Sequence, residues 1–129
     1  MTECTNLSYA NEIYTLASNI IDYVGTCFNI IEDNITLNGG GYAIDGDDLG
    51  ADYGIYVANR TNITIVNFSN ISDFNAGIKL FNISNSLISN INFSSNFHGF
   101  DLDNSSNNRI INISSISDEF YSFYLTFSN

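Results

Sequence analysis

The chain has 129 residues, of which 44% are apolar, so we expect a single folded domain over residues 1–129. Lys and Arg number 3 against 14 Asp and Glu, and the formal charge of -11 excludes nucleic acid as a partner because phosphate binding needs a cationic surface. The sequence has no apolar run of the length, about 18 residues, that a membrane span needs.

The first part of the chain contains short segments rich in β-branched residues, separated by Asn, Ser and Gly. The pattern predicts strands at 14–16, 27–30 and 34–37. Leu37 matches Ile65, and the interval between them is longer than the spacing found later in the chain. We therefore expect the extra residues to form a loop at 39–48.

From residue 54 onward, a repeat of about 22 to 23 residues governs the sequence. The segment Gly54-Ile55-Tyr56-Val57 returns as Gly77-Ile78-Lys79-Leu80, as Gly99-Phe100-Asp101-Leu102 and as Ser122-Phe123-Tyr124-Leu125. Five apolar columns follow this spacing: Ile55, Ile78, Phe100 and Phe123; Val57, Leu80, Leu102 and Leu125; Ile65, Leu87 and Ile110; Phe68, Ile91 and Ile113; Ile71, Phe93 and Ile116. Chance does not explain five columns in register.

Within each repeat, apolar residues alternate in short bursts, which is the strand period. Three short strands per repeat predict an all-β fold, a right-handed parallel β-helix of about five coils. The expected organisation is a set of irregular coils at 1–53, including an inserted acidic loop, followed by regular repeats at 54–129.

The order of these segments resembles a known group of proteins. Cys4, Tyr14-Thr15-Leu16, Gly25–Ile30 and Asn34–Gly46, followed by the Gly-Ile-x-Leu copies, look like the right-handed parallel β-helix repeat proteins of the NosD-like, carbohydrate-binding and sugar-hydrolase type, in the pectin-lyase-like superfamily. The resemblance covers nearly the whole chain and implies the fold. The family contains lyases, hydrolases, epimerases, adhesins and spacers, so the resemblance implies no single activity.

Cys4 and Cys27 are one coil apart, at the same interval as Ile55 and Ile78. Residues one coil apart have Cα atoms about 4.8 Å from each other, within the range of a disulfide, so we expect a Cys4–Cys27 bridge and an extracellular or cell-surface location. The alternative is a pair of free core thiols. The chain opens without a basic and apolar signal segment, which disagrees with export, and we give the cysteine spacing more weight.

Ten asparagines lie in Asn-x-Ser/Thr sequons, more than composition explains. Sequons in columns that should face solvent are candidate N-glycosylation sites: Asn59, Asn82, Asn104, Asn70 and Asn92. Two other columns favour hydrogen-bonded asparagine ladders at turns: Asn67, Asn90 and Asn112; Asn62, Asn85 and Asn107.

Carboxylates gather beside the regular repeats. Asp101 and Asp103 share one face with Lys79, and His98 is close, so these four would be the catalytic residues of a polysaccharide lyase or hydrolase. The alternative is a surface ion pair and a loop histidine, and we favour it because no second cation is near to bind a uronate. We expect no enzyme activity.

Four aspartates crowd the expected loop: Asp45, Asp47, Asp48 and Asp52. Oxygen ligands of this kind suit Ca²⁺, but the spacing is not that of an EF-hand, and a solvated acidic turn is the favoured interpretation. One His and two Cys leave no transition-metal site, and no cofactor is expected.

The last ten residues contain five aromatic side chains and no polar cap, although a solenoid exposes its core at uncapped ends. A second subunit, a longer solenoid or a missing tail would each cover them. We expect an N-glycosylated structural protein whose subunits stack head to tail in a fibre or surface layer. The alternative is a carbohydrate-binding or adhesive module that uses the face of Tyr56, Tyr124 and Asp101.

Overall fold

The computed structural model describes residues 1–116, 118, 119 and 121–126, and of residues 121, 122 and 124–126 it describes the backbone alone. Every regular element in this part of the chain is a strand, and none of it forms a helix long and apolar enough to cross a membrane. The strands are β1 (Thr5–Leu7), β2 (Ile13–Thr15), β3 (Ile20–Tyr23), β4 (Phe28–Ile30), β5 (Thr36–Asn38), β6 (Ala43–Gly46), β7 (Tyr53–Ala58), β8 (Thr64–Ser72), β9 (Ala76–Phe81), β10 (Leu87–Ser94), β11 (His98–Asp103), β12 (Arg109–Ile116) and β13 (Tyr121–Thr126).

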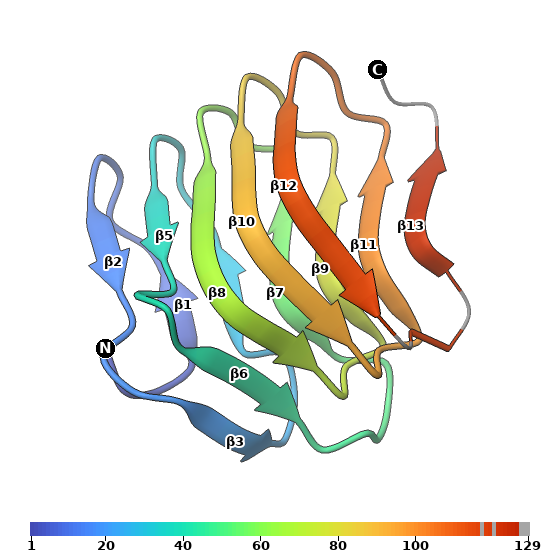
Figure 1. Cartoon of the computed structure of the whole chain (residues 1–129). Coiled ribbons are helices and arrows are strands. Elements are labelled where there is room, and N and C mark those ends of the chain that lie inside the picture. The colour runs from blue at the N-terminus through green and yellow to red at the C-terminus, as the bar shows by residue number, and fades with distance from the viewer. Residues whose placement is uncertain (117, 120, 127–129) are drawn as a thin grey trace.

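The strands form two parallel sheets wound into a solenoid of about five coils, so the predicted fold class is confirmed. One sheet has the order β1-β4-β7-β9-β11-β13, and the other contains β2, β5, β8, β10 and β12 with β3 and β6 attached. As the chain advances from left to right in Figure 1, the second sheet runs down the front and the first runs up the back, which is a right-handed coil.

The number of strands per coil changes along the solenoid. In the early coils β2 and β3, or β5 and β6, are separate strands on two faces, so each coil has three strands. The longer β8, β10 and β12 bend across both faces, and later coils therefore have two strands (Figure 1).

The predicted first column is confirmed, and it extends one coil further back. Phe28, Ile55, Ile78, Phe100 and Phe123 are successive backbone partners across five strands. The first four are fully buried, because each is covered by the coils on both sides. Gly77 lies directly before Ile78 of this column. Its position has no room for a side chain, because a Cβ there would lie 2.5 Å from the Phe93 ring.

Two predicted columns contain an error of one residue. Ile88, not Leu87, pairs with Ile65 and Ile110, and Ile88 is the fully buried residue. Because side chains alternate between the two faces of a strand, a slip of one position turns the wrong side chain inward.

The second error lies at the end of β12. Phe93 pairs with Ser115, and Ile116 is 66% exposed, so Ile116 does not continue the column of Ile71 and Phe93. β10 and β12 keep one register from Leu87 to Ser94, and the interval from Phe93 to Ile116 is one residue longer than that register, so Ile116 faces outward.

The predicted loop at 39–48 is wrong in its bounds. Residues Ala43–Gly46 form β6, which pairs with β3 and β8, and Ile44 is fully buried. The interval from Ile44 to Ile55 is longer than the equivalent interval from Ile71 to Ile78 in the next coil. Most of the inserted residues therefore follow β6, at 47–52.

Buried polar side chains satisfy backbone groups at the corners. The hydroxyls of Ser86 and Ser105 accept hydrogen bonds from the amides of Ile63 and Ile83 at 2.9 and 3.0 Å. The amide oxygen of the fully buried Asn96 accepts one from the backbone N–H of Phe74, in the preceding coil, at 3.0 Å. A buried backbone N–H without a partner is costly, so these residues stabilise turns that strand pairing does not reach.

The predicted disulfide is confirmed. Cys4 and Cys27 are bonded, with their Cα atoms 4.6 Å apart, and Cys27 is almost completely buried. The bridge joins the segment before β1 to the segment before β4, which is the next strand of the same sheet. It therefore ties the first coil to the second.

We predict that replacing both cysteines by serine lowers the free energy of unfolding by about 3 kcal/mol, because a bridge with a sequence separation of 23 restricts the unfolded chain. Urea unfolding with and without dithiothreitol measures the loss. The double variant should not respond to dithiothreitol, and an unchanged midpoint in the reduced parent chain would contradict the prediction.

Candidate functional site

The expected carbohydrate face is a column on the outer surface of the first sheet. Asn29, Tyr56, Lys79 and Asp101 are successive partners, and Tyr124 follows them in backbone register, with its side chain outside the described residues. The Tyr56 ring stacks on Tyr53 with centroids 5.3 Å apart. Tyr56 lines a groove together with Asn6, Asn29, Ala58 and Arg60.

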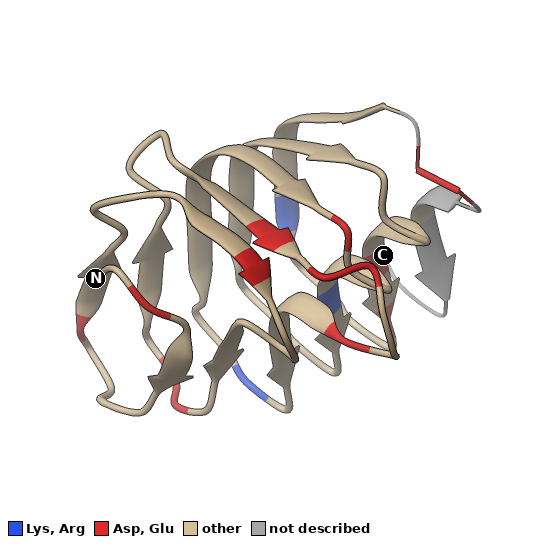
Figure 2. Ribbon diagram, turned by 90° about the horizontal axis from the view of Figure 1, so that it is seen from below, with Lys and Arg blue, Asp and Glu red and all other residues tan. Residues whose placement is uncertain are grey.

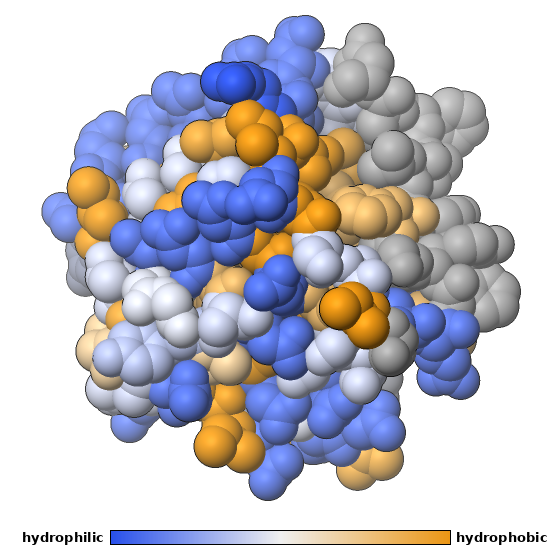
Figure 3. Space-filling model, in the orientation of Figure 1, coloured by the Kyte–Doolittle hydropathy of each residue, from blue (hydrophilic) through white to orange (hydrophobic). Residues whose placement is uncertain are grey.

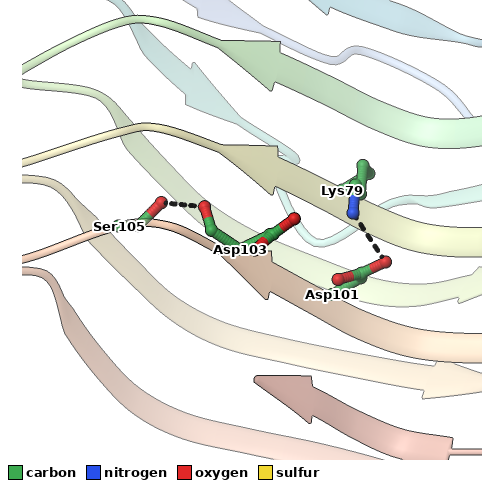
Figure 4. Close-up of polar contacts among 4 residues, drawn as sticks. All are labelled: Lys79, Asp101, Asp103 and Ser105. Carbon is green, nitrogen blue, oxygen red and sulfur yellow. Dashed lines mark hydrogen bonds and ion pairs between the residues drawn. The ribbon is translucent and has the colours of Figure 1, made fainter. Parts of the chain in front are cut away.

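Lys79 and Asp101 form an ion pair across β9 and β11. The Lys79 Nζ donates to Asp101 Oδ2 at 2.9 Å (Figure 4), and the two side chains are 19% and 10% exposed. The expected pair therefore exists, but it is largely buried instead of lying on the open surface. The second carboxylate oxygen of Asp101 is buried and has no hydrogen-bond partner among the described residues.

The other two expected catalytic residues lie at the two ends of β11, the strand that carries Asp101. The backbone oxygen of Asp103 accepts a hydrogen bond from Ser105 at 2.8 Å (Figure 4). His98 begins β11 and contacts the Phe97 ring edge to face, with centroids 4.7 Å apart. Lys79 thus neutralises Asp101.

Acidic residues gather on the side of the solenoid where β3 and β6 lie (Figure 2). Asp45 accepts a hydrogen bond from Ser72 at 2.6 Å, and Asp47 accepts one from the amide of Leu49 at 3.2 Å. Within the described residues, no three His, Cys, Asp or Glu side chains are grouped so that they could hold a metal ion. Two of the four aspartates that the sequence grouped, Asp45 and Asp47, thus bind neighbouring strand and turn residues.

Sequence analysis missed the member of this cluster whose ionisation is most affected. Burial raises the pKa of Asp73, and the neighbouring Asp45, Asp48 and Asp22 raise it further. Asp73 follows Asp45 at the same interval that separates Ile65 from Leu37, which is the spacing of the enlarged coil. This spacing could have identified it.

We predict that the protein gains stability as the pH falls from neutral towards the ordinary aspartate pKa of 3.8, because Asp73 binds its proton more tightly when folded than when unfolded. Asp73→Asn should raise the free energy of unfolding at pH 7 and flatten its pH dependence. Asparagine also suits the backbone φ of 60° at this position. Urea unfolding at several pH values measures both effects.

Asp22→Asn is the matched control, since Asp22 is exposed and has a φ of 52°, but its charge is the last of the causes that act on Asp73. It should give a smaller change. Equal pH profiles for the Asp73 variant and the parent chain would contradict the prediction.

Asparagines form ladders along the corners of the solenoid. The side-chain amide of Asn90 donates to Asn67 at 3.3 Å and that of Asn112 donates to Asn90 at 2.7 Å, so this predicted ladder is confirmed. In the other predicted ladder, the side-chain amide of Asn62 donates to Asn34 in the preceding coil. The amide of Asn34 donates in turn to Asn11 in the first coil. All the asparagines in these columns have a positive φ, which asparagine tolerates well.

The column of Asn59, Asn82 and Asn104 is exposed, as expected for glycan acceptors. Two of its members are also hydrogen-bonded, because the side-chain amide of Asn82 donates to Asn59 at 2.8 Å. Asn92 is exposed as well. Asn70 differs from the prediction: it is half-buried, and its amide exchanges hydrogen bonds with the hydroxyl of Ser94 at 2.8 and 3.1 Å.

The C-terminal end of the described solenoid leaves its core open. Phe123 is 44% exposed, although Phe100 in the same column is fully buried. Ile110 and Ile113 are half-buried, whereas their partners Ile88 and Ile91 are buried. The last described coil has no further described coil over it, so its inward side chains contact solvent.

The N-terminal end covers more of its core, although Tyr14 is half-buried. Leu7 and Leu16 belong to the first coil but are 0% and 1% exposed. Met1 and Cys4 pack against the core there. The two ends of the solenoid are therefore not equivalent.

The edge strands differ in the same way. At the N-terminal end β1, β2 and β3 have 3, 3 and 4 residues, whereas β12 and β13 at the other end have 8 and 6. Figure 3 shows apolar surface among polar residues on the front face where β10 and β12 run, and Ile111 and Ile116 of β12 are exposed. Long edge strands leave a row of unpaired backbone groups, which favours pairing with another chain.

Comparison with known proteins gives no relative from which a function could be transferred: no family model, no curated protein and no solved structure matches this chain.

Proposed function

We propose that this chain is an extracellular, N-glycosylated structural protein whose solenoids stack end to end in a fibre or surface layer. The observation that carries the proposal is the open C-terminal end, where Ile110, Ile113 and Phe123 lose the cover that their column partners have. Covering apolar surface is favourable by about 25 cal/mol per Å², so this end gains from a further coil.

The first coil of a second copy fits as that further coil. Leu7 and Leu125 are the two ends of one column, and Tyr14 and Ile110 are the two ends of another. The interval from Thr5 to its partner Phe28 equals the interval from Phe100 to its partner Phe123 near the other end. Stacking in register therefore continues the apolar columns without a change of period.

The corner ladder would continue as well. Asn11 begins a ladder that runs through Asn34 and Asn62, and Asn107 takes the same left-handed backbone conformation with a φ of 57°. A heterologous contact of this kind repeats from copy to copy, and it produces an open filament where the rotation does not close.

The disulfide and the exposed sequons support an extracellular location for this structural role. Glycans on Asn59, Asn82, Asn104 and Asn92 would lie along the sides of the solenoid and leave its ends accessible. These glycans and the chain's net charge of -11 would both oppose side-by-side aggregation of the solenoids.

We predict that the purified chain associates reversibly with increasing concentration, and that Ile113→Lys weakens this association at least about tenfold by placing a charge in the contact. Ile116→Lys is the matched control, because Ile116 lies on the same strand with its side chain outward and 66% exposed. Sedimentation velocity and negative-stain microscopy give the sizes. Dispersed monomers at high concentration, both for the parent chain and for a chain that begins at Cys4, would contradict the proposal.

We predict that secretion from an N-glycosylating host yields a chain whose mass falls on enzymatic deglycosylation. Asn104→Asp should remove the mass of one glycan while keeping the left-handed turn. Asn107→Asp, at an exposed asparagine outside a sequon, should leave the glycan mass unchanged. A secreted parent chain with the mass of the bare polypeptide would contradict glycosylation.

A further inference from the structure

The segment Met1–Cys4 lies across the N-terminal end of the solenoid. The amino group of Met1 donates to the backbone oxygen of Thr15 at 2.6 Å, and the amide of Ala17 donates to the oxygen of Met1 at 2.7 Å. These two bonds flank Leu16, so Met1 pairs with this edge as a one-residue strand would in a parallel sheet.

The groups that Met1 occupies are those that a stacked coil would need. The amide of Leu16 donates to Asn38 at 2.9 Å, in the direction of the second coil. Because backbone groups of successive strand residues point to opposite sides, the groups of Thr15 and Ala17 point away from the second coil. Met1 therefore satisfies the outward edge of the first coil after β2.

Side-chain cover accompanies these backbone bonds. Met1 is half-buried and packs against the core beside Leu16, which is 1% exposed. Cys4 follows shortly after Met1, and its bond to the buried Cys27 fixes the segment to the solenoid. The cap is thus held at Met1 by hydrogen bonds and at Cys4 by a covalent bond.

We infer that Met1–Cys4 is an autoinhibitory cap that competes with the last coil of a second copy for the N-terminal edge of the solenoid. The inference rests on the proposed end-to-end stacking and adds a contact that limits how tightly the copies associate. The C-terminal end of one copy can pair without rearrangement. Each contact, however, requires that Met1 of the next copy be displaced from Thr15 and Ala17. A chain that lacks this segment stacks more tightly and into longer assemblies.

The test compares two chains released from the same removable leader, one beginning at Met1 and one beginning at Cys4. Both keep the disulfide, which intact mass verifies, and strand content is checked by circular dichroism. We expect sedimentation velocity to show association at least about tenfold tighter for the chain that begins at Cys4. Ile113→Lys in that chain should abolish the gain, and Ile116→Lys should preserve it.

The outcomes separate the cap from the stacking. Equal association of the two chains, weakened by Ile113→Lys in both, would overturn the cap and leave the stacking in place. A gain that survives Ile113→Lys would show contact through another surface and would also overturn the cap. Monomers for both chains at all concentrations would overturn the stacking itself and the inference with it.

Discussion

Parallel pairing in register is the constraint on which this structure depends. Each coil places its residues directly over those of the coil before, so that Ile55, Ile78 and Phe100 form one buried stack. A side chain in such a stack is covered only by its neighbours in the adjacent coils. The stability of every coil therefore depends on the coils beside it, and an end coil is incomplete by itself.

The sharp turns at the corners of the solenoid impose a second constraint, on the backbone conformation, which explains the abundance of asparagine. A coil this short must turn sharply between faces, and these turns place asparagines such as Asn67 and Asn90 at positive φ. Asparagine adopts this conformation more readily than other non-glycine residues, and its amide can bond to the same residue one coil away. One residue type thus serves both the local backbone and the stacking.

The two ends give the molecule a direction. Met1 and the disulfide cover part of the N-terminal end, while Ile110, Ile113 and Phe123 are less covered than their column partners at the other. The acidic cluster around Asp73 and the buried ion pair of Lys79 lie on the sides of the solenoid. The two ends of the described solenoid therefore differ in how much of the core they cover.

The sequence by itself determined the repeat, the parallel solenoid and the Cys4–Cys27 bridge, because a constant spacing along the chain becomes a contact in space. It could not determine register to the residue: Leu87 and Ile88 are both apolar, and only the pairing of β10 shows which one faces inward. The bounds of β6, the turning of Asn70 towards Ser94 and the burial of Asp101 also needed the tertiary structure. Each depends on what lies over the residue in another coil, and a local pattern does not contain that information.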